Sequence, residues 1–575
     1  MNDNKPFSLL YPDSDSEGYS KLTESACHDL ALDVLCAELT ENQKEQNMIM
    51  NVISKMTASK ETAEYRKQIF KDILDLPELR KKMSELFDKI EYIRKFGSSH
   101  IDTDEKLGFW HLMHRLDELD DYIKCVEAMK ECLSDNDIRS EGLISFRKYV
   151  DDLYNEACFA EMKKDITELK KKSSDIQSVT LGINVNDRFE AVSMGLVSVN
   201  SKPFRKSNIV SSFADAVASK NRIHDDCEWN GDMHYHQIEK AGSGFISNIQ
   251  TMGAFTAVTS NAFVDGAVRS TVVNSPEGDN TTNSTWYLDN IMNKILDSLV
   301  KKLRDVLTKY SNIAVVNISG IMPEFVYYIR FAEFIEKKMK CGFRFCEPKI
   351  SENETVSMKA KDLYNLRLAL TMEKPDDIVY NDLDFDKEHS IYILTGANRG
   401  GKTTITQAVG LMFVLAQGGI YVPASEFIFK PADCIYTHFP ADEDKTLDLG
   451  RLGEECVRFK DIYSECTENS LVLLNETFST TSFEEGYYIA RDSVRALLKK
   501  QVRAIYNTHM HKLAESVDEM NAESTGVKAS SLIMKNENGK RSFKVERAAP
   551  EGSSYAKDIA EKYGVTYEML TEGNR

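Results

Sequence analysis

The sequence predicts an α/β domain in its C-terminal part, preceded by a mainly α-helical region that carries a smaller, partly β insertion. Three observations predict this arrangement. From about Asp377 short apolar strands alternate with helical stretches, as in α/β domains. Upstream, apolar residues recur every three or four positions, which is the period of a helix face. Between about Ser178 and Ser284, β-branched residues gather in short runs that Gly, Ser and Asn interrupt.

The bulk composition indicates a folded, multi-domain protein of the cytoplasm. A length of 575 residues exceeds what one core supports, and 42% hydrophobic with 28% charged residues is typical of globular chains. Eleven cysteines without a CxxC pair indicate reduced thiols. We expect no secretory signal, because the N-terminal residues show no basic segment followed by an apolar stretch. We expect no membrane partner, because the longest apolar run, 408–422, is interrupted by Gln417-Gly-Gly.

The net charge of −19 argues against a protein that coats nucleic acid by bulk electrostatics. It leaves open a local basic surface. Lys202, Arg205 and Lys206 in the insertion are the best candidates for contacts to DNA phosphates, although a solvated surface of mixed charge explains them equally well.

The helical regions carry their apolar residues on one face. We assign residues 1–177 to a helical core and outgoing lever, 178–284 to a clamp-like insertion, and 285–349 to returning lever helices. An ordinary helical core is the alternative, and periodicity alone does not choose between the two. The faces of the expected helices comprise Leu112, Leu116, Leu119, Ile123 and Val126; Phe146, Val150, Leu153, Ala157 and Ala160; and Phe325, Tyr328, Ala332 and Ile335.

One cluster in the insertion has the residue types of a metal site. His224, Cys227, His234 and His236 lie close together in the sequence, as zinc ligands do. The acidic residues beside them favour a polar loop over a zinc site.

The strongest motif is a glycine-rich loop between an apolar strand, 391–394, and a helical run, 405–415. It fits G-x-x-x-x-G-K-[ST], in which backbone N–H groups and the helix N-terminus face phosphate oxygens. Lys402 would neutralise the β- and γ-phosphates of ATP, and the Thr403 hydroxyl would bind Mg²⁺. The candidate nucleotide-binding residues here are Gly396, Ala397, Asn398, Arg399, Gly400, Gly401, Lys402, Thr403 and Thr404.

Two further strands end in polar residues that suit the same site. The strand 471–474 is followed by Asn475 and Glu476, where a pair of carboxylates is usual. Asn475 can orient a metal-bound water but brings no charge, while Glu476 is placed to act as general base. We therefore expect Thr403, Asn475 and Glu476 on the Mg²⁺ side, with a surface role for Glu476 as the alternative.

The strand 504–507 runs into Thr508 and His509. A histidine at the carboxyl end of a parallel strand is placed to sense the γ-phosphate, so Lys402, Glu476 and His509 form the expected catalytic set. Downstream, Asn538-Gly539 lies between Ser530–Lys535 and Ser542–Arg547, which predicts a β-hairpin.

Together these segments resemble the MutS family of DNA mismatch-repair ATPases. The resemblance rests on Thr395–Thr404, Gly419–Ala424, Leu471–Glu476, Ser479–Gly486, Tyr506–His509 and the terminal Gly552–Val565. It implies an α/β P-loop (ABC-type) ATPase domain over 350–575 that ends in a dimerisation segment. It also implies a homodimer with two composite ATP sites, a clamp that closes around duplex DNA, and adenine contacts near Ile378 and Asn381.

Three departures from the family pattern bear on function. Asn475 replaces an aspartate, and Gly450–Glu454 stands where the family has a Ser-Thr pair that reaches the partner's nucleotide. We find no mismatch-reading domain ahead of the helical core and no Phe-x-Glu wedge, so we do not expect direct mismatch recognition.

These observations predict a dimeric, DNA-dependent ATPase of DNA repair or recombination, with turnover slowed by Asn475. The alternative is a nucleotide-gated binding module with little or no ATP turnover, acting on branched DNA, RNA or a protein. A relative of the chromosome-maintenance ATPases is a third hypothesis, against which the Val422-Pro-Ala424 element argues.

Overall fold

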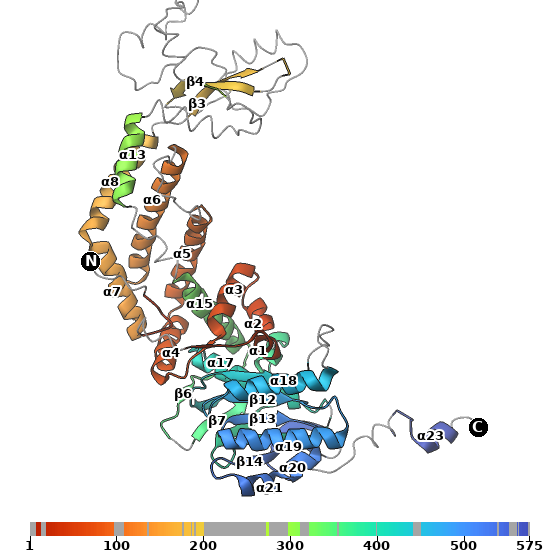
Figure 1. Cartoon of the computed structure of the whole chain (residues 1–575). Coiled ribbons are helices and arrows are strands. Elements are labelled where there is room, and N and C mark those ends of the chain that lie inside the picture. The colour runs from red at the N-terminus through yellow and green to blue at the C-terminus, as the bar shows by residue number, and fades with distance from the viewer. Residues whose placement is uncertain are drawn as a thin grey trace, which may run out of the picture. The chain divides into compact units, whose positions relative to one another are not determined.

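The chain forms two compact units in a computed structural model (Figure 1). The first comprises residues 1–85, 132–149 and 317–575, and the second comprises 86–131 and 150–316. The structure describes residues 7–12, 19–96, 109–134, 137–174, 178–185, 187–188, 191–200, 272–274, 297–310, 321–353, 356–397, 399–440, 450–537, 540–550, 561 and 563–572.

A six-stranded sheet forms the centre of the first unit. Its order is β11-β12-β13-β9-β14-β15, and every pair is parallel except the β14–β15 hairpin. All five residues of β9, β12 and β13 are buried, as expected for central strands covered by helices on both faces. The strands are β9 (Ile391–Thr395), β11 (Ile435–His438), β12 (Leu471–Asn475), β13 (Arg503–Asn507), β14 (Ala529–Glu537) and β15 (Lys540–Glu546).

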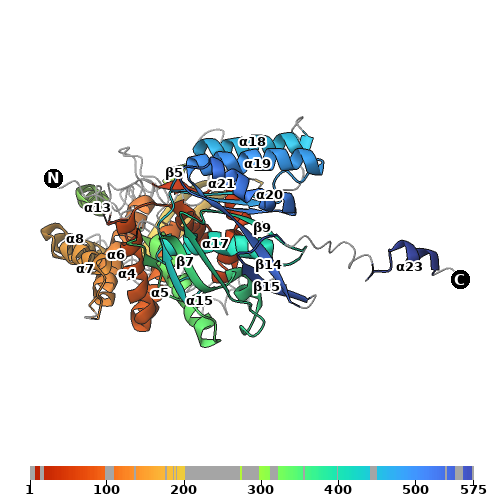
Figure 2. The same cartoon turned by 90° about the horizontal axis from the view of Figure 1, so that it is seen from below.

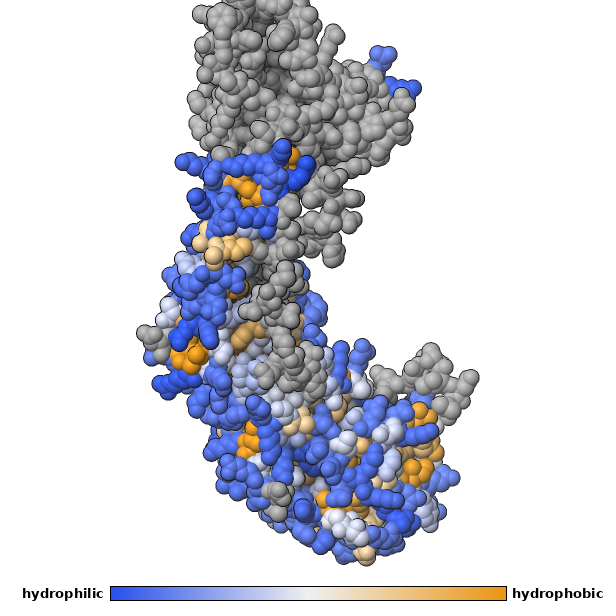
Figure 3. All heavy atoms as spheres, turned by 60° about the vertical axis from the view of Figure 1, so that its left-hand side comes forward, coloured by the Kyte–Doolittle hydropathy of each residue, from blue (hydrophilic) through white to orange (hydrophobic). Residues whose placement is uncertain are grey.

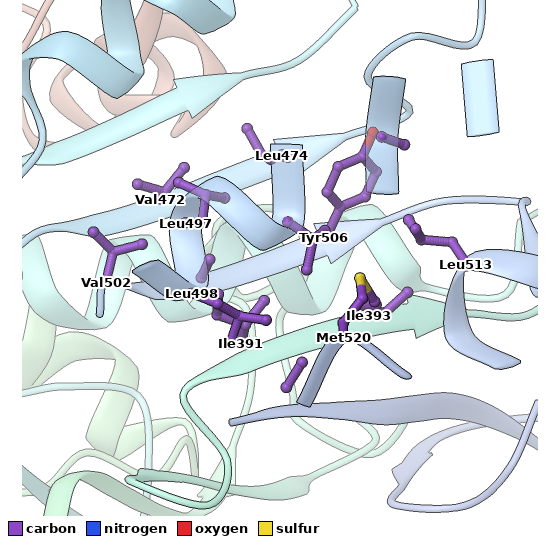
Figure 4. Close-up of a cluster of buried hydrophobic side chains, with 14 of the residues drawn as sticks. Ile391, Ile393, Val472, Leu474, Leu497, Leu498, Val502, Tyr506, Leu513 and Met520 are labelled. Carbon is purple, nitrogen blue, oxygen red and sulfur yellow. The ribbon is translucent and has the colours of Figure 1, made fainter. Parts of the chain in front are cut away.

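Four helices cover one face of this sheet (Figure 2). Alternate residues of β9, β12 and β13 point to this face, because side chains along a strand alternate between the two faces. They pack in one apolar cluster with Leu497, Leu498, Leu513 and Met520 (Figure 4). The helices are α18 (Gly450–Glu465), α19 (Phe483–Lys500), α20 (His511–Glu515) and α21 (Val517–Glu523).

The opposite face carries α17 (Lys402–Gln417), which is buried along almost its whole length. It lies against β12 and β13 and also against helices from the N-terminal part of the chain. At Gly410 a Cβ atom would come within 2.5 Å of Leu30 and 2.8 Å of Leu473, so α17 is packed tightly on both sides. The N-terminal helices are α1 (Glu24–Asp29), α2 (Leu32–Leu39), α3 (Gln43–Ile53) and α4 (Lys60–Asp75), and α15 (Met322–Lys340) packs against α2, α3 and α4.

A smaller four-stranded sheet of order β6-β10-β7-β8 also belongs to the first unit. Its last strand, β8, contacts β15 of the large sheet. The strands are β6 (Lys349–Ile350), β7 (Val356–Leu363), β8 (Asn381–Asp386) and β10 (Glu426–Phe429). The remaining short elements are β1 (Ser20–Lys21), β2 (Lys55–Met56), α16 (Leu366–Thr371) and α23 (Tyr567–Glu572).

The second unit combines helices with an antiparallel sheet of order β3-β4-β5. The strands confirm the β character predicted within 178–284. The elements are α6 (Phe109–Cys132), α8 (Ala157–Ser174), β3 (Ser178–Val185), β4 (Ala191–Asn200), β5 (Val272–Asn274) and α13 (Asp297–Lys309); α5 (Pro77–Phe96) and α7 (Glu141–Asn155) extend from the first unit into the second.

One helix prediction was wrong. The periodicity from Phe146 to Ala160 suggested a single helix, but α7 ends at Asn155 and α8 begins at Ala157. Glu156 separates them: its N–H still bonds to Asp152, while its carbonyl already accepts the first bonds of α8. The helices expected around Leu116 and Phe325 are confirmed as α6 and α15.

Several sequence predictions lie outside the described residues. They are the basic candidates Lys202, Arg205 and Lys206, the possible metal cluster His224, Cys227, His234 and His236, and the loop residue Asn398. In the parts of the chain that the structure describes, no helix is both long and apolar enough to span a bilayer. Figure 3 shows one side of the molecule, where most of the described surface is hydrophilic.

Candidate functional site

A cavity of about 540 Å³ opens where β9, β12 and β13 end. The carboxyl ends of parallel strands are where α/β sheets place their ligands. The cavity is lined by Tyr364, Asn365, Leu368, Met372, Asp377, Val379, Asn381, Arg399, Gly400, Gly401, Lys402, Thr403, Thr404, Ile405, Glu476, His509 and Phe543.

The glycine-rich loop between β9 and α17 forms one wall of the cavity. Gly396 has φ +147° and Gly401 has φ +97°, conformations that residues with a Cβ rarely adopt. A Cβ at Gly396 would also lie 2.8 Å from the Cβ of Met534. The loop leads directly into the N-terminus of α17, whose first N–H groups have no carbonyl one turn earlier to bond. This wall therefore suits an anion such as phosphate.

Lys402 lies at the base of this wall and is buried. Its Nζ donates to the carbonyl of Gly396 at 3.0 Å and to that of Ala397 at 3.3 Å, and it lies 4.0 Å from Glu476 Oε1. Burial lowers the pKa of Lys402, and the charge of Glu476 opposes that shift. Among the described residues a single carboxylate, Glu476, lies close to this buried cation, which is therefore well placed to bind an incoming anion.

Glu476 adopts φ +53°, which is uncommon for a residue with a side chain. Its N–H donates to the carbonyl of Asn507 at 2.9 Å, which stabilises this conformation. The carboxylate faces Lys402 and lies 3.0 Å from His509 Nε2. The structure thus brings together Lys402, Glu476 and His509, the three residues expected to form a catalytic set.

Thr403 connects the cavity to two buried amides. Thr403 Oγ1 donates to Asn475 Oδ1 at 3.1 Å, and Asn507 Nδ2 donates to the same Asn475 oxygen. Sequence reasoning missed Asn507, although the parallel register that pairs it with Asn475 could have suggested it.

The chemistry of this corner fits a hydrated Mg²⁺, whose preferred ligands are oxygens and water. Thr403 lines the cavity, and Asn507 Oδ1 is buried with no donor among the described groups. Such an acceptor is normally satisfied by a partner or by water. No cluster of three or more His, Cys, Asp or Glu ligands occurs among the described residues.

The residues on the apolar side of the cavity differ in part from the adenine contacts expected near Ile378 and Asn381. Ile378 is buried and does not line the cavity, whereas its neighbours Asp377 and Val379 do. Asn381 lines it but uses its side chain to hold β15: Nδ2 donates to the carbonyl of Phe543 at 3.2 Å, and Oδ1 accepts from Val545 N–H at 2.8 Å. Phe543, which sequence reasoning missed, is thereby placed at the cavity.

A buried histidine supports the loop that carries Glu476. His438 Nε2 lies 3.3 Å from the carbonyl oxygen of Glu455, and Nδ1 lies 3.2 Å from Thr477 Oγ1. Because a carbonyl only accepts, Nε2 carries the proton and Nδ1 accepts from Thr477. Burial, helped by the charge of Arg458, lowers the pKa of His438 to about 4. A neutral His438 therefore holds the residue next to Glu476 and the helix α18.

The first turn of α18 contains Gly450–Glu454, the segment that departs from the family pattern. None of these residues lines the cavity of their own chain.

A glycine-rich loop between a buried strand and a helix, followed by lysine and threonine, defines a phosphate-binding class of α/β domain. Two family models match the chain: MutS domain V over residues 392–574 and MutS2 N-terminal domain over 58–256. The chain belongs to the MutS family. The second match gives the helical region a relationship within that family, where sequence reasoning had found a resemblance mainly in layout.

Individual relatives match over 136 to 210 residues. Endonuclease MutS2 of Thermus thermophilus is 27% identical over 194 residues, which cover 34% of this chain and 25% of that protein. DNA mismatch repair protein MutS of Prochlorococcus marinus is 38% identical over 136 residues, 24% of this chain and 15% of that protein. DNA mismatch repair protein Msh6 of Gallus gallus is 30% identical over 210 residues, 35% and 16% respectively. The matched segment spans a quarter or less of the length of these relatives.

Proposed function

We propose that the protein is a DNA-dependent ATPase that acts as a homodimer on duplex DNA in repair or recombination. The observation that carries this proposal is the convergence of Lys402, Glu476 and His509 at one cavity beside the glycine-rich loop. Membership of the MutS family supports it, since two of the relatives above are named DNA mismatch repair proteins.

The loop would bind the triphosphate of ATP. Backbone N–H groups of Gly396–Thr404 and the N-terminus of α17 would contact phosphate oxygens. Lys402 would exchange its contacts with the carbonyls of Gly396 and Ala397 for the β- and γ-phosphates. When bound, Mg²⁺ would neutralise charge that develops on those phosphates. Thr403 would hold the ion directly, and Asn475 would orient its shell.

Glu476 would accept a proton from the attacking water. Its carboxylate lies 4.0 Å from Lys402 Nζ and 3.0 Å from His509 Nε2, beside the loop that would hold the phosphates. His509 would orient Glu476 through the contact at 3.0 Å and sense the γ-phosphate on its half-exposed side. The adenine would lie on the apolar side of the cavity, near Val379, Asn381 and Phe543.

For the domains of the whole chain we keep the boundaries expected from the sequence. We propose a helical core and lever over 1–177, a clamp-like insertion over 178–284, returning helices over 285–349, and the ATPase domain over 350–575. Lys202, Arg205 and Lys206 of the insertion would contact DNA phosphates.

One observation favours a second function. The first polar position after β12 is the uncharged Asn475, hydrogen-bonded to another amide. A site with so little negative charge near the ion suits a nucleotide-gated binding module with little or no turnover.

The test is steady-state ATP hydrolysis by the purified protein, with and without duplex DNA, for the unaltered chain and for Glu476→Gln. We expect hydrolysis that duplex DNA changes, and a loss of roughly a thousandfold in Glu476→Gln with ATP binding retained, since a general base contributes on the order of 10²–10⁴-fold. The matched control is Glu468→Gln, an exposed carboxylate of the same domain, which should leave the rate unchanged.

Equal rates of ATP hydrolysis by the unaltered protein and by Glu476→Gln would contradict a catalytic role for Glu476. ATP binding without hydrolysis would favour the binding module.

A further inference from the structure

Asn507 has no role in the motifs that point to a nucleotide site, yet it lies at the centre of that site's polar corner. We propose that Asn507 and Asn475 act as a directed amide pair: Asn507 holds Asn475 in the orientation that accepts from Thr403, and so positions Thr403 for a divalent cation. This inference rests on the proposed nucleotide function and extends it to a positioning residue.

The sheet places the two amides side by side. β12 and β13 are parallel neighbours, and their register pairs Asn475 with Asn507 at the last position of both strands. Residues paired in this way point to the same face of the sheet. Both side chains are buried, and neither lines the cavity, whereas Thr403 does. The pair therefore acts on the cavity through Thr403.

The hydrogen bonds give the pair a direction. Asn475 Oδ1 accepts from Thr403 Oγ1 at 3.1 Å and from Asn507 Nδ2, while Asn507 Nδ2 also lies 3.4 Å from Thr403 Oγ1. An amide oxygen has two lone pairs, so these two donors use its full capacity. The Thr403 hydroxyl donates its only hydrogen to Asn475 and accepts the longer bond from Asn507 Nδ2, which leaves one oxygen lone pair for a cation.

The side-chain oxygen of Asn507 supports the same conclusion. Asn507 Oδ1 is buried and receives no hydrogen bond from the groups that the structure describes. An unsatisfied buried acceptor beside a hydroxyl ligand suits a water molecule held by a cation. The pair thus offers one oxygen acceptor, Asn507 Oδ1, without negative charge, whereas a carboxylate would bring both an acceptor and a charge.

The direction of the pair makes two isosteric substitutions unequal. Asn475→Asp keeps the acceptor at 475 and adds a charge, so Asn507 and Thr403 can still donate to it. Asn507→Asp adds the same charge but removes the donor and sets two acceptors against each other. If charge alone mattered, the two substitutions would affect a cation equally.

The experiment measures Mn²⁺ binding in the presence of ADP by electron paramagnetic resonance, and ADP binding in EDTA by calorimetry. For Asn475→Asp we expect Mn²⁺ affinity to rise roughly tenfold, because a carboxylate attracts a divalent ion at short range. Asn507→Asp should show no rise, and Asn507→Ala should lower Mn²⁺ affinity roughly fivefold, the value of one hydrogen bond. Asn469→Asp, an exposed change on the same domain, is the charge control and should match the unaltered protein.

ADP affinity in EDTA separates positioning from damage to the fold. We expect it to be unchanged in all four variants, whereas a collapsed site would lower it together with Mn²⁺ affinity. An equal rise in Asn475→Asp and Asn507→Asp, an unchanged Asn507→Ala, or parallel losses of both affinities would each overturn the directed pair. If the unaltered protein binds no ADP under either condition, the proposed nucleotide function fails as well, which is a distinct result.

Discussion

The two walls of the cavity are built in different ways. The loop wall depends on backbone conformation, with glycines at positive φ and one buried lysine. The strand-end wall depends on residues at the ends of β12 and β13: Glu476 and His509 line the cavity, while the amides of Asn475 and Asn507 act on it through Thr403. The loop wall keeps the full phosphate-binding pattern. The strand-end wall carries the uncharged Asn475 at a position where a carboxylate is usual. Nucleotide binding and hydrolysis should therefore respond separately to changes in the two walls.

The largest effect on stability is expected in the loop wall. Gly396→Ala forces a Cβ into a backbone region suited to glycine and against Met534, so the free energy of unfolding should fall by roughly 3 kcal/mol. Urea denaturation measures the change. Gly450→Ala is the matched control, because Gly450 also has positive φ but a Cβ there would meet no atom of the described residues within 4 Å. Equal losses in the two variants would show that crowding at Gly396 is unimportant.

The strand-end wall should respond to pH through His438. Its pKa of about 4 lies below the usual 6.5, so the folded state favours the neutral ring. As pH falls from about 6.5 towards 4, the unfolded chain takes up a proton that the folded chain excludes. The free energy of unfolding therefore decreases, by about 2 kcal/mol between pH 7.5 and 5. His438→Gln should lose this part of the pH dependence, measured by urea denaturation at pH 7.5 and 5.

His28→Gln, a change at an exposed histidine, is the control for that measurement. If His438→Gln retained the same pH dependence as the unaltered protein, the buried neutral histidine would not be its source.

Sequence reasoning located the elements of the site because each motif is local. The loop at Gly396, the strand before Asn475 and the strand before His509 are all where the patterns predicted. The roles of their side chains stay predictions. Asn507 was missed because its importance comes from register with a strand more than thirty residues away in the sequence. Phe543 was missed for a similar reason: Asn381, on β8, holds it at the cavity.

In the helical region, by contrast, the local sequence pattern misplaced a helix boundary. Apolar periodicity passes unbroken through Glu156, but the chain changes helix there because that carbonyl begins a new set of bonds. Periodicity also did not reveal that Leu30, near the start of the chain, packs against Gly410 of α17. Such contacts depend on tertiary packing, which a local sequence pattern does not predict.

The most direct test of the account is equilibrium binding of ATP to the unaltered protein and to Lys402→Ala, with the exposed Lys499→Ala as control. We predict that the unaltered protein and Lys499→Ala bind ATP equally, and that Lys402→Ala binds it roughly a hundredfold more weakly, because a buried cation next to phosphate is lost. Equal binding by all three proteins, or no binding by any of them, would contradict a phosphate-binding role for the loop.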